Sequence, residues 1–557
     1  MTHFILFIIG TGIIKKSLPP QKNKIYIYLL GALFFLFSCI EIIANSFTGT
    51  GFNSAAIYHI LAPKQGFDPW ITIKPIGIFV ATLLFFFLWK KLIKNCKPSF
   101  PRIILIGYAS LILSILLHPF SQFWIQQASF FSVKAAKTQI ISKSVSVDRK
   151  KNLVLLYLEG LEQNYLNETL FPGLTPNLNK IRNNSTVFTE IHGTGFGGYT
   201  IAGFAETQCG IPFIAPINGN KLTNDHSFLP GATCLGDLLK DEGYRLHYLG
   251  GAELGFAGKG KFLTSHGYTN VKGRRILSRQ LDDIRYQSRW GVYDDSLFSF
   301  AKEEYHQLSQ GKKPFVLTLL TLDTHNPKGH INSTCYDKTY EKGQNPMLNA
   351  VHCSDALVGE FINFIRSHPN GKNTVITILS DHLGLNSTAT KRLKEIKRRN
   401  LLMINTPNQK AISINTRGDQ ADTGTTILNS IGFTGQIGQG INLLSKKEQT
   451  KPDINKQDIL ALWEWEKVSD GINIDHYYKK IRIEGESYYP PLILDISKQI
   501  IIAHQYKVQP QRWKQNEIRI NFCNKGNICI SSQYKNIEIK DDKHLSKSFL
   551  TELLQPI

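Results

Sequence analysis

The stretch Asn152-Leu153-Val154-Leu155-Leu156-Tyr157-Leu158-Glu159 decides the fold of this 557-residue chain. Six consecutive apolar residues, Leu153–Leu158, predict a β-strand that is buried on both faces, as in the centre of a parallel sheet. The strand ends directly at a glutamate. Because ligands of open α/β sheets gather at the carboxyl ends of the strands, Glu159 is a candidate site residue.

Three further apolar runs have the same character: Tyr244–Leu249, Phe315–Leu322 and Thr374–Leu379. The second run is followed by His325, and the third by Asp381 and His382. Helical patterns lie between the runs, at Thr233–Glu242 and Asp355–Arg366. Strands that alternate with helices predict an α/β fold with a mixed, mostly parallel sheet flanked by helices.

Four apolar blocks precede this region: Phe4–Ile14, Ile25–Ala44, Ile71–Trp89 and Ile103–Phe123. The last three are close to the ~20 residues that cross a bilayer as a helix. The first is shorter and lacks the basic start and small-residue cleavage site of a signal peptide, which favours a short or partly interfacial span. We therefore expect a transmembrane region over residues 1–125 with three to four helices.

Lysine distribution orients these blocks. The loops after the first and third blocks are rich in lysine, whereas the loop after the second carries only Lys64. The positive-inside rule puts the two basic loops in the cytoplasm, and everything after the fourth block outside. The net charge of +21 favours attraction to anionic lipid. No aromatic-interleaved basic run is present, so we expect no nucleic-acid partner.

The region beyond the membrane divides further. Residues 126–150 are predicted to be a linker or an interfacial helix, 151–445 the main domain, and 446–557 a small β-rich accessory region. The last of these has a helical pattern at Asp453–Trp465 and a hairpin turn at Asn524–Asn527.

Six cysteines follow the membrane region: Cys209, Cys234, Cys335, Cys353, Cys523 and Cys529. Pairing of neighbours along the chain gives three disulfides, one of fifteen possible arrangements, and such bonds require an oxidising compartment. Zinc binding is the alternative, although no C-x-x-C spacing occurs.

A glycine-rich segment, Gly193–Tyr199, leads to Thr200 and a stretch with helical character. Carboxylates and a histidine that hold a divalent cation can turn a threonine hydroxyl into a nucleophile at neutral pH. This chemistry suits attack on phosphate or sulfate esters. The simpler alternative for Thr200 is a helix N-cap, which is a common role for threonine.

These segments resemble the alkaline-phosphatase-like superfamily, in the branch of sulfatase-related phosphoglycerol and phosphoethanolamine transferases. The resemblance covers about residues 25–445. It rests on the following segments: Phe171–Pro176, Tyr199–Gly203, Gln208–Pro212, Phe256–Lys259, Ser265–Gly267, Trp290–Asp295, Asp323–Pro327 and Ser380–Leu383. The glycine-rich segment is longer than usual for the family, and the accessory region is shorter than in the large glucan-decorating enzymes.

The resemblance implies one divalent cation, with Mn²⁺ favoured over Zn²⁺ or Mg²⁺. Its implied ligands are Glu159, Thr200, Asp381 and His382. Thr200 would be the nucleophile, and His325 an acid/base group or a phosphate contact. Lys259 and Trp290 would contact the substrate. Alternatives remain for these three side chains: a hydrogen bond within the turn for His325, a solvated position for Lys259 and a core position for Trp290.

The implied function is transfer of sn-glycerol 1-phosphate from phosphatidylglycerol to periplasmic, osmoregulated glucans. It would proceed through a covalent threonine intermediate and release diacylglycerol, in a bacterial inner-membrane protein whose catalytic domain is periplasmic. Phosphoethanolamine transfer to lipid A, polyglycerolphosphate synthesis, hydrolysis of a phosphate or sulfate ester, and a non-enzymatic anchor are the alternatives. The sequence does not predict the oligomeric state.

Overall fold

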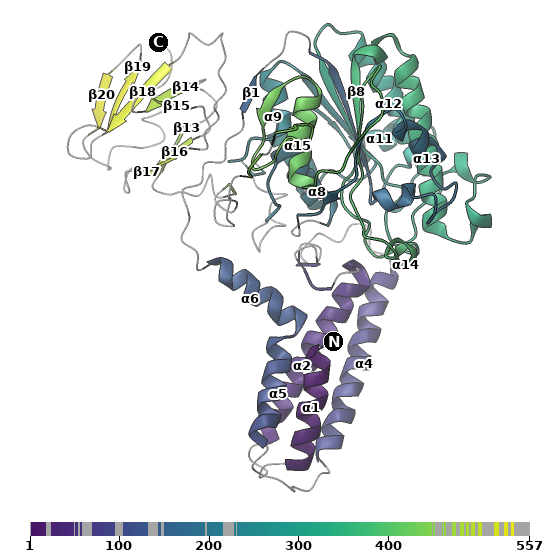
Figure 1. Cartoon of the computed structure of the whole chain (residues 1–557), viewed down its shortest axis with the longest axis vertical. Coiled ribbons are helices and arrows are strands. Elements are labelled where there is room, and N and C mark those ends of the chain that lie inside the picture. Colours follow the sequence, from purple (N-terminus) through teal and green to yellow (C-terminus); the bar gives the residue numbers. More distant parts are fainter. Residues whose placement is uncertain are drawn as a thin grey trace. The chain divides into compact units, whose positions relative to one another are not determined.

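The computed structural model describes residues 2–17, 24–48, 69–94, 104–131, 150–194, 198–214 and 231–447, with shorter pieces between and after them up to residue 539. Contacts within the chain divide it into two compact units, Met1–Lys134 and Ala135–Ile557. The first consists of helices, and the second contains the sheets (Figure 1).

The described residues of the first unit include five apolar helices: α1 (Thr2–Ser17), α2 (Lys24–Thr48), α4 (Pro69–Lys94), α5 (Ile104–Leu116) and α6 (Pro119–Phe131). Two segments are long and apolar enough to cross a membrane, Ile25–Ser46 and Pro75–Ile93. The apolar part of α1, Thr2–Lys15, is shorter. Apolar N-terminal helices are therefore confirmed.

The fourth apolar block differs from the single span that we expected. Helices α5 and α6 are bent by 68° at the break that precedes Pro119. Proline disfavours helical geometry in the residue before it, which accounts for a break here. The 13 residues of α5 rise only about 20 Å, less than the ~30 Å hydrocarbon core. The described residues thus contain two candidate spans, or three if the bent pair counts as one, and three is the lower end of the expected number.

Aromatic packing holds the helices of the first unit together. The ring of Phe7 in α1 stacks on that of Phe34 in α2, with centroids 3.9 Å apart. Trp89 of α4 donates a hydrogen bond to the hydroxyl of Thr11 over 3.1 Å. Other apolar side chains point outward: Leu84 is 60% exposed and Leu105 is 76% exposed. Such extended apolar surface suits contact with lipid.

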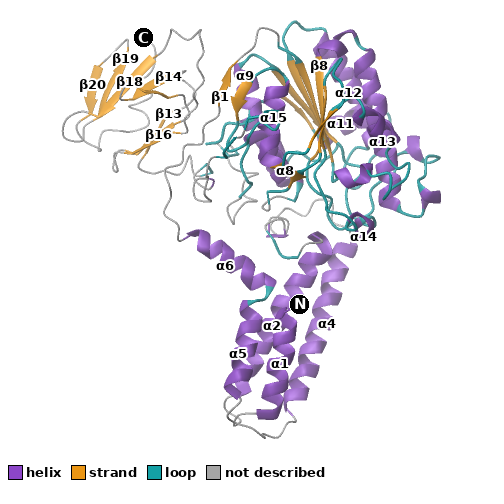
Figure 2. Cartoon of the chain, viewed as in Figure 1, coloured by secondary structure: helices purple, strands orange, loops and turns teal. Residues whose placement is uncertain are grey.

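The second unit is built on an eight-stranded sheet with the order β10-β3-β9-β8-β2-β7-β5-β6 (Figure 2). Its strands are β2 (Asn152–Leu158), β3 (Thr186–Phe188), β5 (Arg245–Gly250), β6 (Asn270–Lys272), β7 (Phe315–Leu320), β8 (Thr374–Ser380), β9 (Leu402–Asn405) and β10 (Ile412–Ile414). Only β9 runs antiparallel to its neighbours, β3 and β8. The mixed, mostly parallel sheet is confirmed.

Helices cover both faces of the sheet (Figure 1). One face carries α7 (Pro176–Arg182), α12 (Asp294–Ser309) and α13 (Pro346–Ser367); the other carries α8 (Thr200–Cys209), α9 (Leu235–Asp241) and α15 (Gln420–Ser430). Side chains of β2 alternate between the layers. Leu156 belongs to the core shared with α12 and α13, whereas the ring of Tyr157 stacks on Phe204 of α8 at 4.2 Å. Every residue of β2 is buried, as its apolar composition requires.

The predicted linker at residues 126–150 contains a strand. β1 (Lys143–Val145) pairs antiparallel with β12 (Thr434–Gln436), so this part of the linker is tied to the main domain rather than forming an interfacial helix. Its other residues after Phe131 lie largely outside the described chain.

The C-terminal region is rich in strands, as expected. A three-stranded sheet contains β13 (Gly471–Ile474), β16 (Leu492–Asp495) and β17 (Ile500–Ala503). A five-stranded sheet contains β14 (Lys480–Ile483), β15 (Glu486–Tyr488), β18 (Glu517–Phe522), β19 (Ile528–Ser532) and β20 (Asn536–Ile539). β18 and β19 pair antiparallel, which agrees with a hairpin, although the turn at 524–527 lies outside the described residues. Most of the helical pattern at 453–465 also lies outside them.

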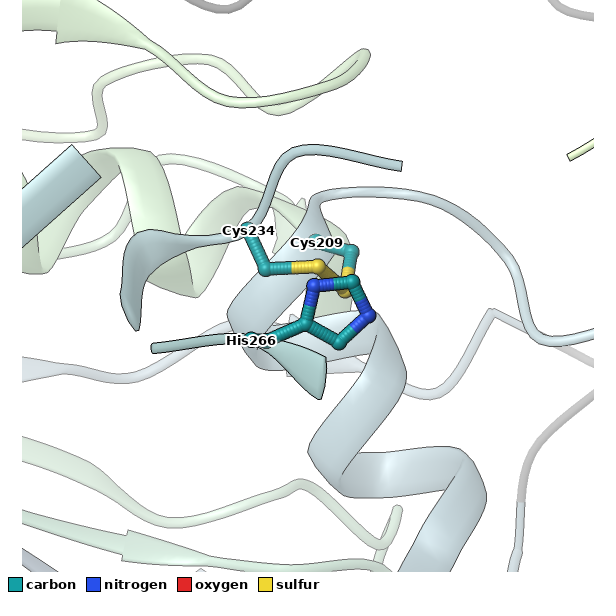
Figure 3. A group of neighbouring side chains, drawn as sticks. All are labelled: Cys209, Cys234 and His266. Atoms are coloured by element: carbon teal, nitrogen blue, oxygen red, sulfur yellow. A yellow bond between two sulfur atoms is a disulfide. The ribbon is translucent and has the colours of Figure 1, made fainter. Parts of the chain in front are cut away.

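Two of the three expected disulfides are present, Cys209–Cys234 and Cys335–Cys353. The third falls on Cys523, outside the described residues. His266 lies beside the first disulfide (Figure 3). Its two ring nitrogens already have partners, the carboxylate of Asp237 at 2.8 Å and the carbonyl of Phe228 at 2.9 Å. Since the sulfurs are bonded to each other, this group is a disulfide rather than the alternative zinc site.

Candidate active site

Three neighbouring strands bring the predicted site residues together. β2 lies between β7 and β8 and runs parallel to both. Glu159 directly follows β2, His325 lies five residues after β7, and Asp381 directly follows β8. Because the three strands point the same way, these side chains meet at one edge of the sheet.

Glu159, Asp381 and His382 form a compact buried group. One potential ligand atom from each lies within 4.8 Å of the others. His382 Nε2 is 3.5 Å from Glu159 Oε1 and 3.3 Å from Asp381 Oδ2. The other ring nitrogen, Nδ1, lies 2.8 Å from the carbonyl of Leu383. A proton on Nδ1 would donate to that carbonyl and leave the Nε2 lone pair for a metal.

The hydrogen bonds of Asp381 also fit a cation. Its Oδ1 accepts from the backbone N–H groups of Gly160 at 2.8 Å and His382 at 2.9 Å. Its Oδ2 is buried and accepts no hydrogen bond. A buried oxygen without a partner is costly unless something else satisfies it. The donor set of two carboxylates and one imidazole would satisfy it with a divalent cation.

Charge crowding supports the same interpretation. Burial, together with the nearby Glu159 carboxylate, raises the pKa of Asp381 to about 7. Burial acts to lower the pKa of His382, but the two carboxylates outweigh it and raise this pKa to about 9. The two carboxylates therefore favour a positive charge between them, and a proton on the His382 ring provides it. A divalent cation would supply that charge and let His382 remain neutral.

Thr200 is the first residue of α8, and its hydroxyl donates to Glu159 Oε2 over 3.3 Å. The N-cap position is occupied by Tyr199, whose side chain makes no capping bond. The N-cap alternative for Thr200 is thus wrong. The hydroxyl instead lies at the positive end of a helix dipole, where a developing negative charge on oxygen is stabilised.

Close backbone contacts fix Thr200 relative to the metal-binding group. A Cβ atom on Gly203, one turn after Thr200, would lie 1.7 Å from the carbonyl oxygen of Asp381. Gln420, the first residue of α15, donates from Nε2 to the same carbonyl. Gly203 lies inside a segment that the sequence singled out, but no sequence signal identified Gln420.

The end of β7 fixes the backbone of Glu159. Its N–H donates to Thr321 Oγ1 over 3.0 Å, and its carbonyl accepts from Thr324 Oγ1 over 2.5 Å. Sequence reasoning missed both threonines, because their role depends on the pairing of β2 with β7. The position of Thr324 beside His325 was the available signal.

Lys259 and His325 border this group. Lys259 is 4% exposed, so the solvated alternative is wrong. Burial lowers its pKa to about 8, while the charges of Glu159 and Asp381 favour its protonated form. His325 Nδ1 lies 2.8 Å from the carbonyl of Asn326, as the turn alternative expected, and Nε2 is left for another partner. Burial lowers the pKa of His325 below its usual value.

Trp290 lies against His325, with ring centroids 4.1 Å apart. Trp290 is only partly buried, so the alternative that it is a core residue is wrong. Its indole forms one wall beside the histidine ring, at the boundary between the buried group and solvent.

Two aspartates that sequence reasoning left without a role hold the loop before His325. The carboxylate of Asp294 accepts from the N–H groups of Leu322 at 2.7 Å and Asp323 at 3.0 Å. Asp323 Oδ2 in turn accepts from the N–H of Asp294 over 3.0 Å. These reciprocal bonds join the end of β7 to the start of α12.

Two protein-family models match this chain. The sulfatase family model matches residues 151–433, just over half of the chain. A second family model, described as phosphoglycerol transferase I, N-terminal domain, matches residues 1–135. Phosphoglycerol transferase I of Escherichia fergusonii is 38% identical over 361 residues, which are 62% of this chain and 47% of the relative. That of Shigella flexneri is 37% identical over 63% of this chain and 47% of its own length. The chain spans about half the length of the curated relatives it matches.

Solved structures give weaker similarities. An alkaline phosphatase superfamily protein from Vibrio parahaemolyticus has a TM-score of 0.45 at 24% identity, with 58% of this chain and 77% of that protein covered. The lipooligosaccharide phosphoethanolamine transferase EptA of Neisseria meningitidis has a TM-score of 0.43 at 14% identity, with 77% and 86% covered. On the match over residues 151–433, this chain belongs to the sulfatase family.

Proposed function

We propose that this chain is a membrane-anchored phosphotransferase that moves sn-glycerol 1-phosphate from phosphatidylglycerol to periplasmic, osmoregulated glucans. The observation that carries the proposal is the Thr200 hydroxyl, which donates over 3.3 Å to Glu159, a member of the buried group that also contains Asp381 and His382. The relatives' name, phosphoglycerol transferase I, supports a phosphoglycerol group as the one that is transferred. In this proposal residues 1–125 are the membrane anchor and residues 126–150 connect it to the catalytic domain, residues 151–445. Residues 446–557 are an accessory region.

Glu159, Thr200, Asp381 and His382 would hold one divalent cation. Their two carboxylates, one hydroxyl and one imidazole suit Mn²⁺, with Zn²⁺ and Mg²⁺ as alternatives that elemental analysis of the purified protein separates. When bound, the cation would lower the pKa of the Thr200 hydroxyl and offset charge on the phosphoryl oxygens.

Thr200 then attacks phosphorus of phosphatidylglycerol. The new bond joins Thr200 Oγ1 to phosphorus, and the bond from phosphorus to the diacylglycerol oxygen breaks. Glu159 accepts the hydrogen bond of the hydroxyl, takes its proton as the new bond forms, and returns that proton to Thr200 Oγ1 in the second step. A hydroxyl of the glucan next attacks the glycerophosphoryl-threonine, which restores the Thr200 hydroxyl and leaves the glycerophosphoryl group on the sugar.

His325 and Lys259 take the remaining roles. His325 Nε2 carries a proton to the leaving diacylglycerol oxygen and removes one from the acceptor hydroxyl in the second step. Once the ring has given up its proton it is neutral, a form that burial favours by keeping the pKa of His325 below its usual value, and it then acts as the base of the second step. Lys259 contacts the phosphoryl oxygens, and its buried ammonium makes that contact stronger than it would be in water. Trp290 lines the substrate's approach to His325.

Two observations support a periplasmic catalytic domain in a bacterial inner membrane. The apolar helices of the first unit suit a bilayer. The Cys209–Cys234 and Cys335–Cys353 disulfides suit an oxidising compartment. A periplasmic domain beside the outer leaflet would have its lipid donor in the membrane that anchors it.

The experiment uses full-length protein with phosphatidylglycerol and Mn²⁺, and peptide mass spectrometry as its readout. We expect a glycerophosphoryl increment on the peptide that contains Thr200, and its disappearance when glucan is added. Thr200→Ala removes the increment, whereas Thr207→Ala, a control in the same helix, retains it. No increment together with full activity of Thr200→Ala would overturn the covalent mechanism. An increment from phosphatidylethanolamine but not from phosphatidylglycerol would replace the proposed donor.

A further inference from the structure

An unusual surface lies between β6 and α12, at residues 274–290. Leu277 is fully buried and Leu281 packs against the main core, so the segment is firmly attached to the domain. Two isoleucines on the same segment are nevertheless left in solvent: Ile276 is 42% exposed and Ile284 is 57% exposed. Exposed isoleucines on a firmly attached segment suggest contact with something apolar.

The charges of this segment are mostly positive. Its arginines are Arg274, Arg275, Arg279, Arg285 and Arg289. The segment itself contains two acidic residues, Asp282 and Asp283, and Asp283 is paired with Arg285 at 3.0 Å. Arg275 and Arg279, which flank Ile276, are exposed. We call residues 274–290 the arginine–isoleucine surface.

Hydrogen bonds make this surface one local structure. Arg274 donates from Nε to Gln287 Oε1 over 2.8 Å and from Nη1 to the carbonyl of Arg289 over 3.1 Å. Gln287 donates to the carbonyl of Ile284 over 2.5 Å. The short helix that carries Ile276 and the turn that carries Ile284 are therefore held together.

The surface is continuous with the candidate active site. It ends at Trp290, whose ring lies 4.1 Å from that of His325. The charge of Arg289 also acts on His330, five residues after His325. A ligand that rests on the arginine–isoleucine surface is thus adjacent to the acid/base histidine.

We propose that the arginine–isoleucine surface docks on the anionic head groups of the bilayer that holds the apolar helices. This inference rests on the proposed function, because a lipid donor must reach a buried site. Arginines attract anionic head groups, and isoleucine side chains insert at the level where head groups meet acyl chains. Docking would present the donor's phosphate at the edge next to Trp290.

Chain length permits this docking. Helix α6 ends at Phe131, and β1, which pairs with β12 of the sheet unit, begins at Lys143. The 11 residues between them reach at most about 40 Å when fully extended. This tether keeps the domain near the bilayer, so even weak surface contacts are effective.

The test uses full-length protein in nanodiscs and a polarity-sensitive fluorophore attached at Ile284→Cys. Ile412→Cys is the matched control, since Ile412 is 47% exposed on β10, the opposite edge strand of the sheet. Labelled protein without a new cysteine corrects for Cys39 and Cys96. Nanodiscs contain phosphatidylcholine with or without phosphatidylserine, an anionic lipid that is not the proposed donor.

We expect spin-labelled lipid to quench the probe at 284 at least twofold more than the probe at 412. Phosphatidylserine should strengthen this quenching, and Arg275→Gln with Arg279→Gln should remove the effect of phosphatidylserine. Equal quenching at both positions would overturn the docking proposal, as would a response at 284 only to an anionic oligosaccharide. Quenching at 284 in a protein that transfers no glycerophosphate when phosphatidylglycerol and glucan are also supplied would leave docking intact and count against the proposed function alone.

Discussion

The two units of this chain use apolar side chains in opposite ways. In the sheet unit the apolar residues of β2 are all buried, and polar groups of the active site lie at the strand ends. In the helical unit Phe85 and Leu105 are 64% and 76% exposed. The difference shows that the solvent, not the residue type, decides where an apolar side chain lies. It also separates the unit that contains the candidate active site from the unit that contains the apolar helices.

Metal removal is expected to have the largest effect, and it should affect the sheet unit but not the helical unit. A chelator should lower transfer activity by about a hundredfold or more, because the metal-binding group would lose its central charge. Hydrogen exchange should rise in β2 and β8, which deliver Glu159 and Asp381, and stay unchanged in α2. Peptide-resolved exchange by mass spectrometry measures both units in one sample. Equal changes in both units would show that the separation is false.

A second prediction compares one glycine from each unit. Gly203→Ala puts a methyl group on the carbonyl of Asp381, whereas a Cβ atom on Gly77 in α4 has nothing within 4 Å. Overpacking of this kind costs about 1–3 kcal/mol, and a 1 Å shift of a reacting group can cost about a hundredfold in rate. We expect Gly203→Ala to lose most activity and Gly77→Ala to keep it. Kinetics and denaturation of both variants provide the measurement.

Cysteines give the third comparison. The double change Cys335→Ser and Cys353→Ser opens a disulfide with a sequence separation of 18, which should cost about 3 kcal/mol of unfolding free energy. Cys39→Ala, in α2, removes an unpaired buried thiol and should change stability by less than about 1 kcal/mol. Thermal melting with and without reductant distinguishes them. A similar loss in both variants would contradict the assignment of the disulfide.

The smallest expected effect concerns pH. Burial raises the pKa of Glu206 in α8 to about 8, above its ordinary value of 4.5. Between about pH 4.5 and 8, Glu206 therefore keeps its proton in the folded state but loses it in the unfolded state. The contribution of Glu206 to stability is complete below about pH 4.5 and is lost as pH rises through about 8. Glu206→Gln should melt like the parent protein at acidic pH and a few degrees higher at pH 9. A melting difference that does not change with pH would refute this origin.

Much of the fold could be predicted because local composition and tertiary burial agree. The strand at Asn152–Leu158 has the predicted bounds, since an unbroken apolar run suits only a doubly covered strand. The break before Pro119 was missed because hydropathy counts residues but does not describe the path of the backbone. The strand at Lys143–Val145 was missed because its partner lies about 290 residues later in the chain.

The grouping of the candidate site was predictable where the side chains directly follow an apolar strand, as at Glu159 and at Asp381-His382. Supporting contacts were not, because they join residues from different elements. Nothing in the sequence near Gln420 indicates that its amide meets the carbonyl of Asp381. The burial of Lys259 likewise depends on packing around it, which a single sequence does not reveal.

The contact between Gly203 and Asp381 has one more consequence. Helix α8 and the end of β8 touch backbone to backbone, which fixes Thr200 relative to Asp381 and His382. Such a centre does not need to rearrange for one ester or another. Substrate choice is then left to the periphery, where the partly buried Trp290 can change without disturbing the centre. Substitutions at the edge of the site should therefore disturb the structure little, whereas substitutions around Thr200 and Asp381 should disturb it strongly.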